Sequence, residues 1–292
     1  MRDSFRFTDV NGIRTRFTEI GRGDPLVLIH GGHYGDYMSA QCWDLNLSGL
    51  SKHFRVITFD KLGMGYTDNP VRDEDYTMEA TVDHAHHFLL KMKLKNINLI
   101  GHSRGAFLAA RLAIDYPDIV KSLVIVDTAT LAPDDGSVPV DFYAKIDKES
   151  PLVPTRESIR KEPEMNSYST DHVTDEFIEK RLKIALLPKI LEARRKMVTL
   201  KSAVFLPSLN KKKEETLGLI ESGSLKQPTI VIWSLNDPSA PVKIGIDLFR
   251  MIASKNEYAE MHLINQAGHY SYREHPAEFN RVVASFLMPE LY

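Results

Sequence analysis

The sequence has a single cysteine, Cys42, among its 292 residues. An intramolecular disulfide is therefore excluded, and the cysteine usage gives no indication of an oxidising compartment. The sequence also lacks any run approaching the ~18 apolar residues of a membrane span. Residues 1–6 hold no apolar core of a signal peptide. From these absences we expect a cytoplasmic protein without a membrane partner.

An excess of charge of either sign is also lacking. The 37 Lys and Arg residues nearly balance the 39 Asp and Glu residues, which gives a formal net charge of −2. Such a chain offers no electrostatic footprint for nucleic acid. Hydrophobic residues make up 43% of the sequence, as in a globular protein with a substantial core. We predict a small-molecule substrate and no nucleic-acid partner, and we leave a homodimer open.

Signatures of metal and nucleotide sites are missing as well. His84, His86 and His87 lie close together in a predicted helix, but they have no cysteine and no defined third ligand position, so they do not predict a zinc site. The glycine-bearing loop 60–66 lacks the Gly-Lys-Ser/Thr motif that binds phosphate at the start of a helix. We therefore predict neither a metal nor a cofactor.

Short apolar runs alternate with helical patterns along most of the chain. Asn11-Gly12 joins two segments of alternating polarity, 5–10 and 13–20, and this predicts a β-hairpin with a type I′ turn. Short, largely apolar runs predict six further strands, at 26–29, 54–59, 97–100, 123–126, 229–233 and 260–264. Helical stretches follow several of them. The pattern predicts an α/β fold with a mostly parallel eight-stranded sheet flanked by helices.

One long segment, residues 134–224, interrupts the alternation. It contains helical patterns, such as residues 175–187, but no convincing strand. We interpret it as an inserted helical lid. Residues 1–133 and 225–292 are then predicted to form a single core domain.

The pentapeptide Gly101-His102-Ser103-Arg104-Gly105 stands between a predicted strand and a predicted helix. Gly-x-Ser-x-Gly at such a turn is typical of a nucleophile elbow. The turn strains the serine backbone and leaves no room for side chains two residues to either side, which explains the two glycines. We predict that Ser103 is a nucleophile, and the alternative is a helix N-cap.

A serine nucleophile needs a histidine base that a carboxylate orients, in the chain order Ser, acid, His. His269 lies in the loop after the last predicted strand, where Gly268 would allow a tight turn. His275 is a weaker candidate because it stands at a predicted helix start. Two acids remain open, since Asp237 follows the seventh strand and Asp127 ends the sixth. We favour Asp237, because the loop after the seventh strand is the usual place of this carboxylate.

Backbone amides near the serine are candidates for an oxyanion hole. His30-Gly31-Gly32 follows the third predicted strand, from which one donor is expected, and the residue after the nucleophile supplies the other. Gly32 and Arg104 are therefore the predicted donors, and each such donor is typically worth ~3 kcal/mol. The alternative is a glycine turn that serves only chain reversal. For the Arg104 side chain a surface ion pair is the simple expectation.

Two segments near the C-terminus resemble those of the meta-cleavage product hydrolases of aromatic-ring degradation, in the α/β-hydrolase superfamily. They are residues 234–241, which hold Asp237, and residues 268–280, which hold His269. The resemblance implies an α/β-hydrolase fold and hydrolysis of a carbon–carbon bond in a vinylogous 1,5-diketone. It also implies an arginine of the lid that binds the dienolate or carboxylate end. Arg181 is the best match, and an exposed helix arginine is the alternative interpretation.

The sequence departs from that family around the predicted site. Many members have Asn before the nucleophile, Met-Gly-Gly after it and Trp after the histidine, whereas this chain has His102, Arg104-Gly105-Ala106 and Tyr270. These positions line or abut the family's site. We therefore expect His102 and Tyr270, together with Trp43 and Arg181, to contact the substrate.

Alternative functions follow from the same residues. A carboxylesterase or lactonase would use the same triad without a site for a dienolate. A ligand-binding protein on this fold would normally have lost a residue of the triad, and here all three are present. Ser103 argues against dehalogenase and epoxide hydrolase chemistry, which uses a carboxylate nucleophile. The resemblance leaves open whether the serine is acylated or assists a water molecule.

Overall fold

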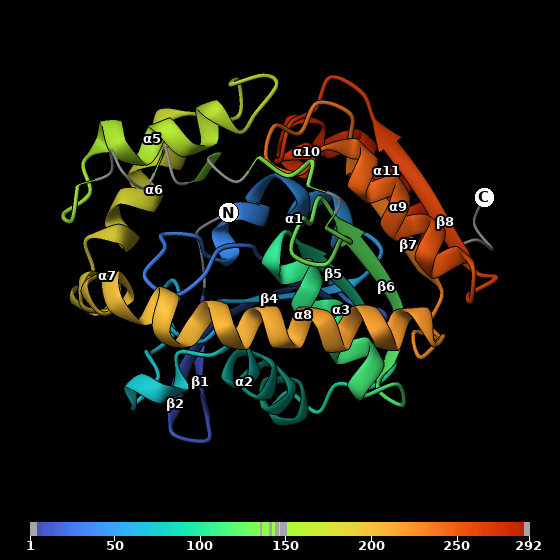
Figure 1. Cartoon of the computed structure of the whole chain (residues 1–292), viewed down its shortest axis with the longest axis horizontal. Coiled ribbons are helices and arrows are strands. Elements are labelled where there is room, and N and C mark those ends of the chain that lie inside the picture. Colours follow the sequence, from blue (N-terminus) through green and yellow to red (C-terminus); the bar gives the residue numbers. More distant parts are fainter. Residues whose placement is uncertain (1–4, 135, 140–141, 144–145, 147–150, 289–292) are drawn as a thin grey trace.

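The computed structural model describes residues 5–134, 136–139, 142–143, 146 and 151–288, and these contain one eight-stranded sheet (Figure 1). The strands are β1 (Arg6–Val10), β2 (Ile13–Ile20), β3 (Pro25–Ile29), β4 (Arg55–Phe59), β5 (Ile97–His102), β6 (Val120–Val126), β7 (Thr229–Ser234) and β8 (Ala259–Ile264). Their order in the sheet is β1-β2-β4-β3-β5-β6-β7-β8. Only the pairs β1–β2 and β2–β4 are antiparallel. The mostly parallel eight-stranded sheet predicted from the sequence is thus confirmed.

Alternate residues of the central strands belong to two separate hydrophobic clusters, one on each face of the sheet. Successive side chains of a strand point to opposite faces, so a strand covered on both sides is apolar throughout. One face carries Val27, Leu99, Leu123 and Val231. The other face carries the next residue of each strand, namely Leu28, Ile100, Val124 and Ile232. This double burial explains why these strands are continuous apolar runs in the sequence.

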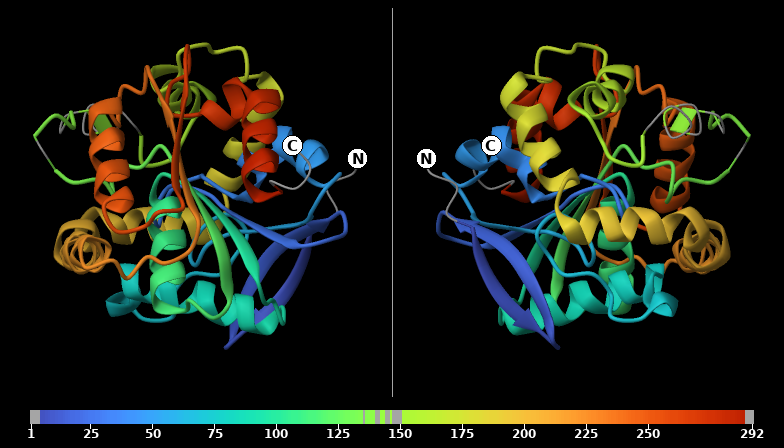
Figure 2. Two further views of the ribbon diagram at one scale, coloured as in Figure 1. Left: turned by 90° about the vertical axis from the view of Figure 1, so that its right-hand side faces the viewer. Right: turned by 90° about the vertical axis from the view of Figure 1, so that its left-hand side faces the viewer.

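Helices cover both faces of this sheet. On the first face pack α2 (Met78–Lys91), α3 (Arg104–Asp115), α8 (Leu206–Glu221) and α9 (Val242–Ala253). On the second face lie η1 (Ala40–Trp43), α1 (Asp44–Leu50) and α11 (Pro276–Leu287). Two further short helices of the described residues lie outside the inserted segment, η2 (Asp73–Asp75) and α10 (Ser271–Glu274). The β1–β2 hairpin projects from one edge, and Asn11 (φ 53°) and Gly12 (φ 85°) form its turn as predicted (Figure 2).

Between β6 and β7 the described residues form helices joined by loops and contain no strand. They form α5 (Arg156–Met165), α6 (Asp175–Ala185), α7 (Pro188–Leu200), the π-helical segment η3 (Lys201–Phe205) and α8. Helices α5 and α6 share a small cluster of their own around Ile159 and Phe177. Phe205 and Leu209, in contrast, pack in the main core. The predicted lid therefore has two parts that pack differently. Helices α5 and α6 form a small cluster of their own, whereas α8 covers the sheet as the core helices do.

In the described part of the chain, no helix is long and apolar enough to cross a membrane. The same residues hold no group of three His, Cys, Asp or Glu side chains placed to bind a metal ion. His84, one of the three clustered histidines, instead shares a hydrogen bond of 2.9 Å with the Thr15 hydroxyl. His86 stacks on Tyr116 with ring centroids 3.5 Å apart.

Candidate active site

Ser103 lies at the turn between β5 and α3, with φ 55° and ψ −127°. A non-glycine residue held at positive φ is strained, and such strain persists where the surroundings enforce it. The backbone around the two flanking glycines is packed so closely that it holds Ser103 in this conformation. A Cβ on Gly101 would lie 2.2 Å from the carbonyl oxygen of Gly105, and one on Gly105 would lie 2.4 Å from that of Ile29. The geometry is that of the predicted elbow, and the glycines are required by close backbone approach.

His269 and Asp237 are hydrogen-bonded to each other in the interior. The Nδ1 atom of His269 lies 2.6 Å from Oδ2 of Asp237, and both side chains are buried. The other carboxylate oxygen, Oδ1, accepts from the backbone and hydroxyl of Ser239 and from the backbone of Ala240 at 2.8–2.9 Å. Burial alone would lower the pKa of His269, but the charge and hydrogen bond of Asp237 raise it above its ordinary value. The arrangement leaves Nε2 of His269 as the nitrogen that can take up a proton.

Asp127, the rival acid, occupies a different position. Its carboxylate accepts from the backbone and hydroxyl of Ser234 at 2.7 and 3.0 Å and from the hydroxyl of Ser271 at 2.7 Å. Burial, followed by the nearby charge of Asp237, raises the pKa of Asp127. Asp237, and not Asp127, is thus the carboxylate that bonds to His269.

The loop that carries His269 is clamped to the inserted helices. The backbone N–H of His269 donates to the carbonyl of Asn166 at 2.7 Å. Glu274 accepts from the N–H groups of Gly268, Tyr168 and Ser169 at 2.8–2.9 Å. Gly268 is not among the residues with a positive φ, so its backbone conformation does not by itself require glycine. A Cβ at 268 would lie 2.5 Å from the Asn166 carbonyl oxygen, and close packing is the reason for glycine.

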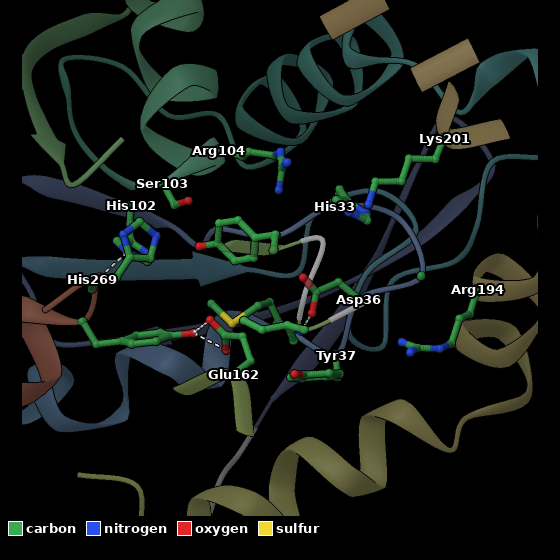
Figure 3. Close-up of a pocket in the computed structure, with 17 residues that line it drawn as sticks. His33, Asp36, Tyr37, His102, Ser103, Arg104, Glu162, Arg194, Lys201 and His269 are labelled. Carbon is green, nitrogen blue, oxygen red and sulfur yellow. Dashed lines mark hydrogen bonds between the residues drawn. The ribbon is translucent and has the colours of Figure 1, made fainter. Parts of the chain in front are cut away.

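These groups open onto one pocket, shown in Figure 3. Its lining comes from the loop after β3, the elbow, the inserted region and the histidine loop: Gly31, Gly32, His33, Gly35, Asp36, Tyr37, Met38, His102, Ser103, Arg104, Tyr143, Ile146, Glu162, Arg194, Lys201, His269 and Tyr270. The three predicted triad residues divide between rim and interior, because Ser103 and His269 line the pocket while Asp237 lies behind His269.

The two predicted oxyanion donors both lie in this lining. Gly32 has φ 76°, a conformation that favours glycine. Arg104 is the first residue of α3, so its N–H has no acceptor within the helix. Behind the loop, Nζ of the buried Lys61 donates to the carbonyl of Gly32 at 2.9 Å. Burial lowers the pKa of Lys61 to about 7.

His102 lies beside the catalytic loop. One of its ring nitrogens, Nε2, is 2.7 Å from the backbone carbonyl of His269 and donates to it. Burial, with the charge of His269, lowers the pKa of His102 well below its usual value, so the ring is neutral. Its Nδ1 atom is then an acceptor, and among the described residues it has no hydrogen-bond partner.

Arg181 and Trp43 do not line the pocket. The Arg181 guanidinium is buried behind it, paired with Glu162 at 3.1 Å and 3.2 Å from the Tyr270 hydroxyl. The Tyr270 hydroxyl donates to Glu162 at 2.7 Å. Arg181 is therefore not the exposed helix arginine of the alternative interpretation, and it contacts the lining residues Glu162, Tyr270 and Met38 without lining the pocket itself. Trp43 is fully buried against Tyr272, with ring centroids 4.2 Å apart, so it packs in the core instead of contacting a substrate.

The side chain of His275, the weaker base candidate, is also outside the pocket, and its Nε2 lies 2.9 Å from the carbonyl of Gln266. The sequence reasoning missed Lys61, Glu162 and Lys201. Lys61 follows the end of β4, and polar residues at the carboxyl ends of parallel strands often reach a site, so this signal was available. Glu162 and Lys201 lie in inserted helices, where nothing in the sequence separates them from surface residues.

Comparison with known proteins shows the family to which the chain belongs. The family model described as alpha/beta hydrolase fold matches residues 24–276. A 2-hydroxymuconate semialdehyde hydrolase from Pseudomonas sp. (strain CF600) is 30% identical over 278 residues, which cover 94% of this chain and 91% of that protein. A 2-hydroxy-6-oxo-2,4-heptadienoate hydrolase from Pseudomonas putida is 27% identical, with 98% and 96% covered. A solved meta-cleavage product hydrolase from Pseudomonas fluorescens IP01 superposes with a TM-score of 0.78 at 25% identity, covering 97% of each chain. The chain therefore belongs to the alpha/beta hydrolase family and, within it, is related to the meta-cleavage product hydrolases.

Proposed function

We propose that this protein is a serine hydrolase that cleaves a carbon–carbon bond beside the ketone of a vinylogous diketone or dienoate. The observation that carries the proposal is the 2.6 Å hydrogen bond between His269 and Asp237, in a pocket that also holds the strained Ser103. Relatives whose names give a heptadienoate or a hexa-2,4-dienoic acid as the compound hydrolysed support the choice of substrate class.

In this proposal Nε2 of His269 takes the proton of the Ser103 hydroxyl as the oxygen attacks the ketone carbonyl. The backbone N–H groups of Gly32 and Arg104 stabilise the oxyanion. Asp237 holds the His269 tautomer and stabilises the imidazolium. The imidazolium then protonates the departing carbon, and water releases the acyl half as a carboxylic acid. No cofactor takes part in this sequence.

A carbon leaving group needs its charge delocalised into a conjugated enolate. At the pocket wall next to His269, the group that could stabilise such a charge is the Arg181 guanidinium, which is buried behind Tyr270 and donates to its hydroxyl at 3.2 Å. Arg181 acts here as a positioning residue, because it contacts the lining residues Glu162, Tyr270 and Met38 but does not line the pocket itself.

One observation favours the ester or lactone alternative. The carboxylate of Glu162 already neutralises Arg181, so an anionic leaving group would face a negative charge where the resemblance implies a free arginine. An ester substrate has no need of a charge at that wall, because its oxygen leaving group carries the electron pair itself.

The variant Glu162→Gln distinguishes a carbon–carbon hydrolase from an ester or lactone hydrolase. If the substrate is a dienoate, removing the competing carboxylate frees the Arg181 charge, and KM for the dienoate should fall by about tenfold, or ~1.4 kcal/mol, while a neutral nitrophenyl ester is unaffected. Arg181→Gln should lower kcat on the dienoate much more than on the ester. Equal effects on both substrates, or no dienoate turnover by the parent enzyme, would favour the esterase or lactonase.

A further inference from the structure

A buried lysine lies directly behind the backbone of the proposed oxyanion hole. Lys61, in the loop after β4, is 3% exposed and does not line the pocket, yet its Nζ donates to the carbonyl of Gly32 at 2.9 Å. We propose that Lys61 is a positioning residue of the reaction, which holds the Gly32 N–H in place for the oxyanion and stabilises the negative charge through the backbone. This role presupposes the proposed serine hydrolase function and adds a residue to its mechanism.

Lys61 fixes the backbone on both sides of Gly32. Its Nζ holds the peptide that follows Gly32, whereas its backbone N–H donates to Nε2 of His30 at 3.1 Å. Burial lowers the pKa of His30 well below its usual value, so the ring is neutral and carries its proton on Nδ1. That nitrogen donates to the carbonyl of Gly31 at 2.8 Å. Because the carbonyl and the N–H of a trans peptide point in opposite directions, this bond directs the Gly32 N–H away from His30.

The loop needs such bonds because it contains two consecutive glycines. Glycine has wide conformational freedom, so this loop does not hold its N–H groups in place by itself. Side chains do not fit at either position. A Cβ on Gly31 would lie 3.0 Å from Cβ of Ser103, and one on Gly32 would lie 2.7 Å from Cε of Met64. The order of the loop therefore depends on hydrogen bonds to its carbonyls, and Lys61 supplies one of them directly.

The burial of Lys61 has a cost that packing alone does not require. Removing an ammonium group from water is unfavourable, and it lowers the pKa of Lys61 to about 7. A methionine would fill a similar space without this cost. The lysine thus offers what methionine lacks, an N–H donor and a positive charge at the Gly32 carbonyl.

The groups that face Lys61 come from three elements. Arg104 at the start of α3 lowers the pKa of Lys61 further, and Asp36 in the loop after β3 raises it. The thiol of Cys42 in η1 is neutral, because burial raises its pKa to about 12. Three neighbouring histidines are neutral as well, since burial lowers their pKa values well below the usual value: His30, His33 and His102. Near neutral pH, Lys61 is therefore the group among these that changes its charge.

The charge on Nζ acts on the reaction through the Gly32 backbone. When Ser103 attacks, the oxyanion accepts from the Gly32 N–H, and the bond at the Gly32 carbonyl keeps that residue from turning. Hydrogen bonds that share a chain of peptides strengthen one another. A positive charge behind the loop also stabilises an oxyanion in a site from which water is excluded.

Lys61→Met tests this role in steady-state kinetics. Its kcat should fall by about 10- to 100-fold, which is less than the ~10²–10³-fold cost of deleting an oxyanion donor. Its KM should stay within about twofold, because Lys61 does not line the pocket. Lys61→Gln lacks the charge and is one bond shorter, so it should also lose kcat, and it covers the case in which Lys61→Met does not fold.

The matched control is Lys189→Met, which deletes an inner lysine of α7 outside the pocket. Burial lowers the pKa of Lys189 to about 8, and its Nζ has no hydrogen-bond partner among the described residues. This variant should keep the kcat of the wild-type protein. A wild-type kcat in a folded Lys61 variant, or a loss through KM alone, would overturn the role of Lys61.

The pH dependence distinguishes this role from a structural one. The ratio of kcat for the wild-type protein to kcat for Lys61→Met cancels the titration of His269, which both proteins share. An ammonium group donates a stronger hydrogen bond than a neutral amine. The ratio should therefore be highest at acidic pH and fall as the pH rises through about 7. A ratio that stays constant through that range would contradict the proposal.

Phosphonylation of Ser103 by a 4-nitrophenyl phosphonate measures the same role without a substrate that is turned over. The phosphoryl oxygen takes the place of the oxyanion, so Lys61→Met should react about tenfold or more slowly than the wild-type protein and Lys189→Met. Equal rates for the three proteins would overturn the role of Lys61. If Lys61→Met is slowed as expected but the wild-type protein hydrolyses no dienoate, the positioning role stands and the carbon–carbon reaction fails.

Discussion

Replacing Asp237 with Asn should cost far more activity than replacing Asp127 with Asn. At Asp237, Oδ1 accepts three hydrogen bonds, from the backbone and hydroxyl of Ser239 and from the backbone of Ala240. An asparagine would keep its oxygen on that side, since two of the three donors are fixed backbone N–H groups. Its NH₂ group would then face His269 and donate to Nδ1.

That reversed hydrogen bond forces the proton of His269 onto Nε2, the nitrogen that must accept the serine proton. In serine proteases the equivalent exchange of acid for amide lowers kcat by ~10⁴-fold, or about 5.5 kcal/mol, and we expect a loss of this size here. At Asp127, two of the three partners are hydroxyls of Ser234 and Ser271, which can rotate to accept from an amide. We therefore expect Asp127→Asn to lose less than about tenfold, or ~1.4 kcal/mol.

Steady-state kinetics of the two variants on one substrate is the assay, and nitrogen-15 NMR of the imidazole tests the tautomer directly. Wild-type His269 should carry its proton on Nδ1, and Asp237→Asn should move it to Nε2 while the melting temperature stays close to that of Asp127→Asn. A larger loss in Asp127→Asn, or an unchanged tautomer in an inactive Asp237→Asn, would refute this reasoning.

Three further predictions follow from the same geometry. Ser103→Ala should remove turnover and labelling by an organophosphonate without changing the fold, and full activity in a folded variant would contradict the nucleophile assignment. The acid limb of kcat/KM should have its midpoint above pH 6.5, because the raised pKa of His269 keeps the base protonated, and hence inactive, to a higher pH than a free histidine. Gly105→Ala should destabilise the protein strongly, since its Cβ would lie 2.4 Å from the Ile29 carbonyl, whereas Gly218→Ala in open space within α8 should stabilise it by about 0.5–1 kcal/mol in thermal unfolding.

The sheet was predictable because its strands obey strong local rules. Strands buried on both faces are apolar runs, and Asn11-Gly12 demands the positive φ values that the turn has. The elbow was predictable for the same reason. The tight turn leaves no room for a side chain at Gly101 or Gly105, and this requirement is visible within five residues of sequence. Asp237 could be favoured over Asp127 from its position after β7, and the hydrogen bond to His269 agrees.

Contacts between segments that are distant in the chain could not be predicted from the sequence. Trp43 was expected at the substrate, yet its burial against Tyr272 depends on how η1 meets the C-terminal helices. Arg181 was expected to face a ligand, and only the fold shows that Glu162, nineteen positions away, reaches it first. The glycine at 268 was expected for its turn, and the sequence did not show that the Asn166 backbone of another element also leaves no room for a side chain there. Such contacts depend on packing between distant segments, which no local pattern encodes.

The most direct test of the account is the ratio of kcat/KM for a conjugated dienoate ring-cleavage product to that for a simple nitrophenyl ester, measured on wild-type protein with the products identified by mass spectrometry. We expect a higher value for the dienoate, with cleavage at the carbon–carbon bond into a carboxylic acid and a keto acid. Rapid ester hydrolysis with no cleavage of the dienoate would contradict it.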